Sequence, residues 1–293
     1  MSDEVKVISI TVSNRSSDKD KSDEDGINMP LEKHVSDPGS SHIKESKQLV
    51  IAFAKMSDDD LLIIRQFTCM FKTLTFGVNF KWDTRITHFI IKTQTDNLCN
   101  HRTHKFLHAL LSGCFIVNLE WVQQSLNSKT LLPENDFMPF DITGEPSPLT
   151  AWRVRRGIID SPMDWAKNCI IYFHKSSKYH LSYSKSQVWA MKAGFVLASE
   201  LEELNDEKYS MRVILVNSPE TDMRYNMFYP NQVQIMEWLT KYKAVTIYIN
   251  WFLECLFRFK FVPFEPQYQV MKLSNALIES SDLNGFMFQL EDA

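Results

Sequence analysis

The sequence predicts an α/β fold in which a parallel sheet with helices on both faces is built twice in tandem. From residue 49 onward, short apolar runs typical of buried strands alternate with amphipathic segments of helical period. Strands separated by helices favour parallel pairing, because the helix carries the chain back across the face of the sheet. A strand that leads into a helix with tryptophan in its first turn occurs twice, and Trp121 and Trp251 are 130 residues apart. Two copies of a four-stranded unit explain the length better than one large sheet.

The first repeat begins with a compact apolar strand at residues 49–53. Ser57 and the three aspartates after it predict a helix start, because a hydroxyl caps the first turn and carboxylates favour the positive end of the helix dipole. This helix runs to about Phe71 and has one apolar face. The other elements expected here are strands at 74–80, 87–91 and 114–117, a helix at about 104–111, and a closing helix at 119–127.

The second repeat follows the same order of elements. The two repeats can be aligned at their C-terminal ends. There, residues 114–121 match residues 244–251, and each stretch is a strand that runs into a helix. The elements expected in this repeat are strands at 169–173, 195–198, 213–216 and 245–249, and helices at 185–194, at 229–241 and from about 250. We expect the two repeats to pack through an interface of helices, to which Trp152, Trp165 and Trp238 contribute.

Composition sets the domain boundaries. Residues 1–46 contain ten serines and ten acidic residues but no aromatic residue, so we expect a disordered leader there. The expected organisation is a leader at 1–46, a first repeat at 47–138, a linker at 139–162, a second repeat at 163–272 and a tail at 273–293.

Several functional classes are disfavoured by what the chain contains. The five cysteines form no Cys-x-x-Cys pair, which disfavours a RING domain, so a ubiquitin ligase role would require a complex with another chain. There is neither a Gly-rich phosphate loop nor a Gly-x-Ser-x-Gly motif, so we expect no enzyme and no cofactor. No apolar run approaches the length of a membrane span, and we expect no membrane partner. The net charge of −4 predicts weak or no direct binding to nucleic acid.

The stretch HRTHKFLH, residues 101–108, places three histidines near an arginine, a threonine and a lysine. If Thr103 caps a helix, then the N–H groups of the next turn, the helix dipole and the Lys105 ammonium converge on one anion site. The same cap disfavours zinc, because His101 would lie outside the helix, and no nearby cysteine or carboxylate completes a ligand set. We therefore expect no metal and interpret the histidines as solvated.

The chain resembles the BRCT family, and within it the tandem pairs of the breast cancer susceptibility class. The tandem repeats of the RING-domain partner of that class are a close competitor. The resemblance is dense from Thr87 to Phe137 and patchier over the second repeat. The matching positions are Thr87-His88, Lys92-Thr93, Cys99, Arg102-Thr103-x-Lys105, Gly113, Trp121-Val122 and Asn135-Asp136-Phe137.

This resemblance implies a nuclear module of the DNA damage response and DNA repair that binds phosphoserine peptides with an aromatic residue three positions later. The implied partners are phosphorylated repair proteins, with chromatin as a further candidate. The positions that match the phosphate site are Thr103, Lys105, Ala54 and Lys55, and those that match the peptide site are Arg102, Leu107, Leu253 and Lys241.

Two of these positions depart from the family pattern. The family has a serine and a glycine at the end of the first strand, where this chain has Ala54 and Lys55. Loss of a charge-assisted hydrogen bond weakens binding by about ten- to a hundredfold, although Lys55 or Ser57 could offset it. Lys241 replaces a pocket methionine, and a small shift of the alignment would place Leu239 or Tyr242 there instead. The alternative function is a phosphate-independent scaffold that binds chromatin, a nucleosome or a protein partner.

Overall fold

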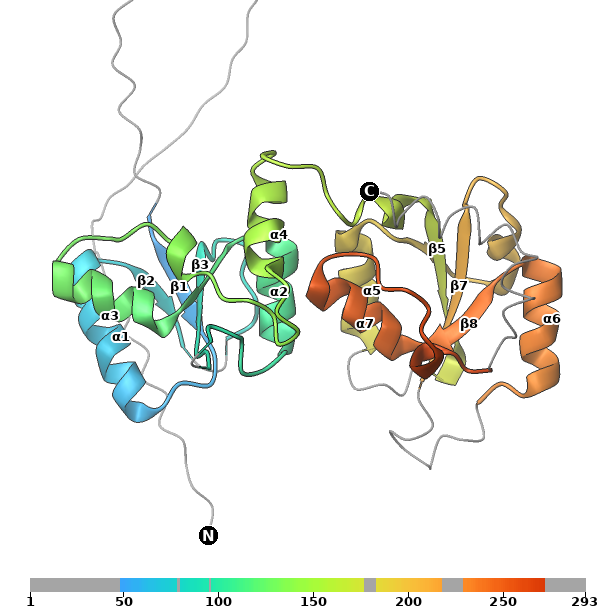
Figure 1. Cartoon of the computed structure of the whole chain (residues 1–293), viewed down its shortest axis with the longest axis horizontal. Coiled ribbons are helices and arrows are strands. Elements are labelled where there is room, and N and C mark those ends of the chain that lie inside the picture. Colours follow the sequence, from blue (N-terminus) through green and yellow to red (C-terminus); the bar gives the residue numbers. More distant parts are fainter. Residues whose placement is uncertain (1–47, 78–79, 95, 177–182, 218–228, 272–293) are drawn as a thin grey trace, which may run out of the picture. The chain divides into compact units, whose positions relative to one another are not determined.

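The computed structural model describes residues 48–77, 80–94, 96–176, 183–217 and 229–271. The chain divides after Ser46, and all described residues belong to the part that follows. They form two four-stranded parallel sheets with the strand orders β2-β1-β3-β4 and β6-β5-β7-β8 (Figure 1). The predicted α/β class and the duplication are confirmed. The predicted leader at 1–46 and tail at 273–293 lie outside the described residues.

The first repeat contains every predicted element. Its strands are β1 (Val50–Phe53), β2 (Leu74–Phe76), β3 (His88–Ile91) and β4 (Phe115–Asn118), and its helices are α1 (Asp58–Phe71), α2 (His104–Ser112) and α3 (Leu119–Ser128). The strand predicted at 74–80 ends at Phe76 and is therefore short. It lies at the edge of the sheet. Within the predicted linker at 139–162, residues Ser147–Arg155 form a helix, α4.

The second repeat follows the same plan. Its strands are β5 (Cys169–Phe173), β6 (Val196–Ala198), β7 (Met211–Val216) and β8 (Val245–Tyr248), and its helices are α5 (Tyr183–Ala193), α6 (Gln232–Tyr242) and α7 (Ile249–Arg258). In each repeat the last strand runs directly into the closing helix, and β4 and β8 keep the 130-residue offset expected from the sequence.

Each closing helix is held to its repeat by a buried tryptophan. The indole N–H of Trp121 donates to the carbonyl of Leu132 at 2.9 Å, and that of Trp251 donates to the carbonyl of Val262 at 2.6 Å. Both side chains are fully buried, so the hydrogen bond satisfies the only polar atom of each indole. The same side chain therefore fills the core and ties down the segment that follows the helix.

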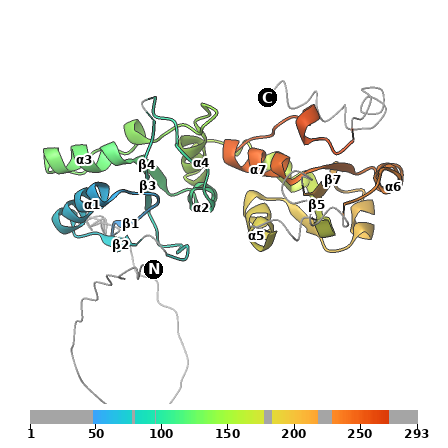
Figure 2. The same ribbon diagram turned by 90° about the horizontal axis from the view of Figure 1, so that it is seen from below.

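The helices divide between the two faces of each sheet. In the first repeat, α1 and α3 pack against one another on one face and α2 covers the other (Figure 1, Figure 2). In the second repeat, α5 and α7 contribute to one apolar cluster and α6 to the other. Because side chains of a strand alternate between faces, one strand can supply both clusters, and Ile51 and Ala52 of β1 point to opposite sides.

The contact between the repeats joins α2 to α5 and α7, while α4 packs on α2 and β4. Gly113 allows α4 to approach, because it has φ +60° and a Cβ atom there would lie 2.4 Å from Cβ of Arg155. Of the other helices, α3 packs on α1 and α6 packs on β8.

The three tryptophans predicted at this interface pack elsewhere. Trp152 stacks on Phe115 at 4.9 Å between ring centroids, and Trp165 lies against Phe195 in the second repeat at 5.1 Å. Trp238 contacts the ring of His174 at 5.3 Å, also in the second repeat. The reason is local: each lies on an element whose own sheet or helix partner offers enough apolar surface to bury an indole.

Substitution of either closing-helix tryptophan by alanine should cost about 3–5 kcal/mol of unfolding free energy, because it opens a large core cavity and leaves a carbonyl unpaired. Urea titrations of Trp121→Ala and Trp251→Ala would measure this. Trp121→Phe is the matched control and should cost less, since it keeps most of the packing. Unchanged stability of both alanine variants would contradict the structural role given to the pair.

Candidate functional site

The N-terminal end of α2 is capped by Thr103 as predicted. Thr103 has extended backbone angles, φ −103° and ψ 161°, and its hydroxyl oxygen accepts a hydrogen bond from the Phe106 N–H at 3.1 Å. The hydroxyl hydrogen is therefore available to a different acceptor. The first N–H groups of an α-helix have their acceptors outside the helix, and the dipole makes this end positive. The geometry here is that of an anion site.

Lys105 lies in the first turn of α2 and is half-buried. Its ammonium nitrogen is 4.3 Å from the centroid of the Phe80 ring, a cation–π distance. Burial lowers the pKa of Lys105 below its usual value, because removal from water disfavours the charged form. An anion placed beside this ammonium would favour its charged form and so oppose the effect of burial.

The end of β1 lies at the same edge of the sheet as the beginning of α2. The carboxyl ends of parallel neighbours share one edge, and β1 pairs with β3, the strand that leads to α2. Ala54 packs against the apolar cluster that contains Phe106 and Leu107, so its side chain is on the α2 face. A serine at this position would present its hydroxyl on the same face. The structure thus brings the position of the missing hydroxyl to the side of the sheet that carries Thr103.

Lys55 adopts a left-handed backbone conformation with φ +54°. Glycine favours this region, and the family pattern has glycine at this position. The local backbone that the pattern requires is therefore retained although the residue differs. The side chain of Lys55 is exposed and adds a positive charge to this edge.

Ser57 does not replace the missing hydroxyl. Its hydroxyl caps α1, donating to the Asp60 carboxylate at 2.7 Å and accepting from the Asp60 N–H at 3.3 Å. Lys92 completes this cluster with an ion pair to Asp60 at 2.9 Å. Asp58 and Asp59 begin α1 nearby in the chain and are exposed, so both signs of charge are present at this edge.

Arg102 joins the two repeats. Its guanidinium donates two hydrogen bonds to Asp141, at 2.9 and 2.5 Å, and a third to Glu254 on α7. It also lies over the Phe257 ring, 5.0 Å from the centroid. Three of the five guanidinium N–H groups are thereby used within the protein. The resemblance assigns Arg102 to the peptide, and the structure shows in addition a link between the first repeat and α7.

Asp141 is fully buried and depends on this arginine. Burial raises the pKa of its carboxyl group, but hydrogen bonds from Arg102 and Thr143 and the charge of Arg102 together hold that pKa below its usual value. Thr143 donates through its hydroxyl at 2.8 Å and its N–H at 3.2 Å. The carboxylate is thus ionised and fully bonded, as a buried charge must be.

Of the residues predicted for an aromatic pocket, Lys241 is not brought together with the others. Leu107 lies on the buried face of α2 and is fully buried in an apolar cluster. Leu253 on α7 is half-buried and packs against the same cluster. Lys241 lies on α6, exposed, with its ammonium 4.8 Å from the centroid of the Tyr242 ring. No hydrogen bond, ion pair or ring contact among the described residues connects Lys241 to Arg102 or Leu253. The physical reason is that α2 packs on α5 and α7 and not on α6.

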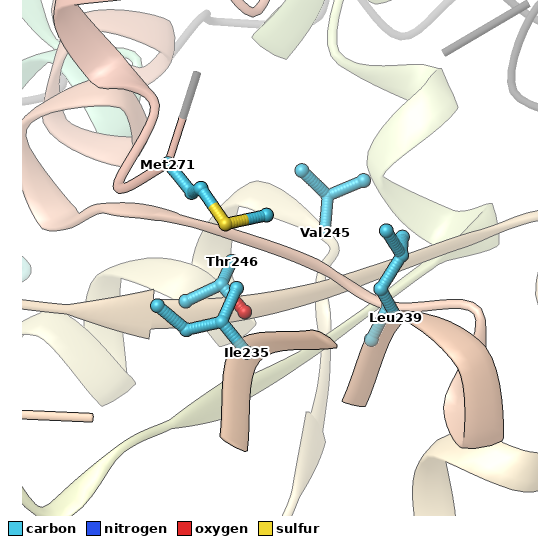
Figure 3. A pocket seen from close by; sticks show the side chains of 6 residues that line it. Ile235, Leu239, Val245, Thr246 and Met271 are labelled. Carbon is cyan, nitrogen blue, oxygen red and sulfur yellow. The ribbon is translucent and has the colours of Figure 1, made fainter. Parts of the chain in front are cut away.

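The two alternatives to Lys241 belong to the interior of the second repeat. Leu239 lines a cavity of about 10 Å³ with Ile235, Val245 and Met271, shown in Figure 3. This volume admits at most one water molecule and no aromatic ring. Tyr242 is buried and donates through its hydroxyl to Glu202 at 3.4 Å.

A larger pocket of about 200 Å³ lies in the second repeat. None of the predicted site residues lines it. The lining residues come from the ends of β5 and β6 and from α5, and are Tyr172, Phe173, Gln187, Met191, Leu197, Ala198 and Ser199.

His108, which was expected to be solvated, is instead part of the contact between α2 and α5. Its ring stacks on Trp82 at 5.7 Å, and its Nε2 accepts a hydrogen bond from the Trp189 indole at 3.3 Å. Burial and then the charges of Lys192, Lys185 and His104 lower the pKa of His108 to about 4. Trp189 is the interface tryptophan that sequence reasoning missed. The only signal in the sequence was its helical spacing within 185–194.

The histidines do not form a metal site with other residues. Among the residues that the structure describes, no group of three histidine, cysteine or acidic side chains could hold a metal ion. His101 precedes the cap and is exposed, and His104 begins α2. In the same part of the chain, no helix has the length and apolar character that crossing a membrane requires.

Arg102→Met should destabilise the protein by about 3–5 kcal/mol, because it leaves the buried Asp141 carboxylate without its charged partner. Glu254→Gln, which keeps the Arg102–Asp141 pair and changes a partly exposed group, should cost about 1 kcal/mol or less. Denaturant titration of both variants tests the difference. Equal losses would show that the link to α7, and not the buried carboxylate, dominates.

Acidification should weaken the fold through His108. Its folded pKa of about 4 lies below the ordinary histidine value of 6.5, so the unfolded chain binds the proton more readily. The contribution to stability is present above pH about 6.5 and is lost as the pH falls toward about 4. His108→Gln keeps an acceptor for Trp189 and should flatten the dependence of stability on pH over this window. His101→Gln is the control, and an identical pH profile in both variants would contradict the assignment.

Comparison with known proteins gives limited but consistent likenesses. No protein-family model matches the chain. A breast cancer susceptibility 1 homologue of Arabidopsis thaliana is 28% identical over 106 residues, which are 35% of this chain and 10% of that protein. The chain therefore spans only a small part of the curated relative that it matches.

Solved structures are similar over both repeats. The BRCT5-BRCT6 domains of S. pombe Brc1 have 14% identity and a TM-score of 0.44, covering 77% of this chain and 98% of theirs. Rtt107p, solved in complex with a phosphorylated histone, has 14% identity and a TM-score of 0.42, covering 76% of this chain and 93% of its own. The two four-stranded parallel sheets and the two tryptophan-bearing closing helices were expected from the sequence. The described residues form two units with the same order of strands, each closed by a helix that carries a buried tryptophan, and part of the sequence resembles a breast cancer susceptibility 1 homologue.

Proposed function

We propose that the first repeat binds phosphoserine peptides at the N-terminal end of α2, as a protein-interaction module of the DNA damage response. The observation that carries this proposal is the Thr103 cap followed by Lys105 in the first turn of α2. Helix N-termini of this kind bind phosphate through backbone N–H groups and the dipole. The half-buried ammonium adds a charge-assisted bond.

Each residue of the site has a distinct part in this proposal. The hydroxyl hydrogen of Thr103 and the N–H groups of the first turn donate to the phosphate oxygens, while Lys105 and Lys55 neutralise its charge. Ala54 offers no hydroxyl, so the phosphate is held by fewer bonds than the family pattern provides. Arg102 has two N–H groups beyond its three internal bonds and can use them on the peptide backbone.

The apolar part of the peptide site is reduced to Leu253. Its half-buried side chain lies next in sequence to Glu254, the partner of Arg102. Leu107 supports this region from within the core, and Lys241 is remote from it by all described contacts. Selectivity for an aromatic residue should accordingly be weak.

The proposed partners are phosphorylated proteins of DNA repair, in the nucleus, with chromatin as a further candidate. This choice follows the BRCT resemblance and the relative's name, "Protein BREAST CANCER SUSCEPTIBILITY 1 homolog". The module acts by binding and needs neither a cofactor nor a catalytic step for this role.

A phosphate-independent scaffold is the second candidate, favoured by one observation. Ala54 removes a phosphate ligand at an edge where Asp58 and Asp59 are exposed, and these carboxylates repel a dianion. A scaffold would use the same surface without needing the charge of the phosphate.

Paired peptides of sequence Ser-x-x-Phe, with and without phosphate, distinguish the two functions. Lys105→Met should weaken binding of the phosphopeptide by about ten- to a hundredfold, since a charge-assisted bond is worth about 1.5–3 kcal/mol. Lys55→Ala should weaken it up to about fivefold because this charge is exposed. Fluorescence polarisation with both peptides would measure these changes.

Ala54→Ser provides the opposite test. It restores a hydroxyl on the α2 face and should tighten phosphopeptide binding by about tenfold without affecting the unphosphorylated peptide. Lys208→Ala, in the second repeat, is the control for loss of a surface charge. Equal, weak binding of both peptides by every variant would exclude the phosphate-dependent function and leave the scaffold.

A further inference from the structure

A row of basic side chains runs along the contact between α2 and α5. Lys185, Trp189 and Lys192 follow helical spacing and so lie on one face of α5. Trp189 turns this face toward α2, because its ring is 5.3 Å from that of His104 and its indole bonds to His108. We call His104, Lys185 and Lys192 the basic seam.

Within the described residues, the seam is positively charged and no ion pair offsets its lysines. The Lys185 ammonium lies 3.4 Å from Nδ1 of His104, and no described carboxylate forms an ion pair with Lys185 or Lys192. Other lysines are paired, for example Lys260 with Glu145. Burial and then the charges of Lys192, Lys185 and His104 lower the pKa of His108. The seam is a local departure in a chain whose net charge is −4.

The seam begins at the proposed phosphate site. His104 follows Thr103 directly and is the first residue of α2. Lys185 and Lys192 are seven residues apart on a helix, which corresponds to roughly 10 Å, the length of about three residues of extended peptide. A peptide whose phosphate occupies the α2 end would bring its neighbouring residues over these lysines.

We propose that the basic seam selects acidic residues within about four positions of the phosphoserine, so that the preferred ligand is an acidic phosphopeptide. This inference rests on the proposed phosphate site and adds its sequence preference. A carboxylate over Lys185 or Lys192 relieves the repulsion between these two ammonium groups and gains an ion pair. The buried Leu107 and the distant Lys241 leave no enclosed aromatic pocket among the predicted site residues to compete with this preference.

Three phosphoserine peptides test the seam: one flanked by alanine, one with aspartates on the C-terminal side, and one with aspartates on the N-terminal side. One of the two acidic peptides should bind roughly 3- to 10-fold tighter than the alanine peptide at low salt, and the advantage should shrink as salt is raised. The double variant Lys185→Ala/Lys192→Ala should lose this advantage while still preferring phosphorylated over unphosphorylated peptide. Lys208→Ala should keep it, and thermal melting would confirm that each variant is folded.

The outcomes separate the inference from the function on which it rests. Equal binding of all three phosphopeptides, with the phosphate preference intact, overturns the seam and leaves the phosphate site. An acidic advantage that persists in the double variant also overturns it. If the protein without substitutions binds phosphorylated and unphosphorylated peptides equally, the proposed function itself is overturned. A DNA duplex is included as a competitor. If the duplex binds more tightly than the phosphopeptides, and this binding is lost in the double variant, the seam binds nucleic acid and its role in peptide selection is overturned.

Discussion

The arrangement of the two repeats depends on one buried charge. Asp141 is enclosed in the segment between α3 and α4, and an ionised carboxylate in that position requires a cation. Arg102 meets this requirement and, being planar with several donors, extends to Glu254 on α7 as well. The residue that precedes the Thr103 cap is therefore fixed from two sides. The position and orientation of the N-terminal end of α2 therefore follow from the need to pair the buried Asp141 carboxylate. The candidate binding site at this end is held in place by the same bonds.

Structural and binding roles overlap along α2. Its buried face anchors the first sheet, its first turn carries the proposed anion site, and the turn that follows carries His108 into the contact with Trp189. Gly113 ends the helix where α4 must approach closely. Because these roles share one nine-residue helix, a change in stability at one position alters the geometry available to a ligand at another. Measurements of binding in this region need a parallel measurement of folding.

Local patterns in the sequence predicted most of the fold, and non-local contacts explain what was missed. Strand and helix positions, the caps at Ser57 and Thr103 and the 130-residue repeat all follow from residues close together in the chain. The bond between Trp189 and His108 joins residues 81 positions apart, and helical spacing alone cannot reveal it. Lys241 was assigned by an alignment through a weakly matching segment. The choice of α5 and α7 as partners of α2 is decided by packing in three dimensions, which a linear pattern does not contain.

The packing of α2 against α5 and α7 joins unlike surfaces, since α2 corresponds in the repeat to α6, and α5 and α7 correspond to α1 and α3. An interface between unlike surfaces can in principle continue from unit to unit without closing. Whether it continues depends on the next equivalent surface, which is α6. The exposed residues of α6 are mostly polar, namely Gln232, Gln234, Glu237, Thr240 and Lys241, and Val233 is an exposed apolar residue among them. Among the described residues, the face of the second repeat that corresponds to α2 is therefore mostly polar, as are the outer faces of capping units in solenoid proteins.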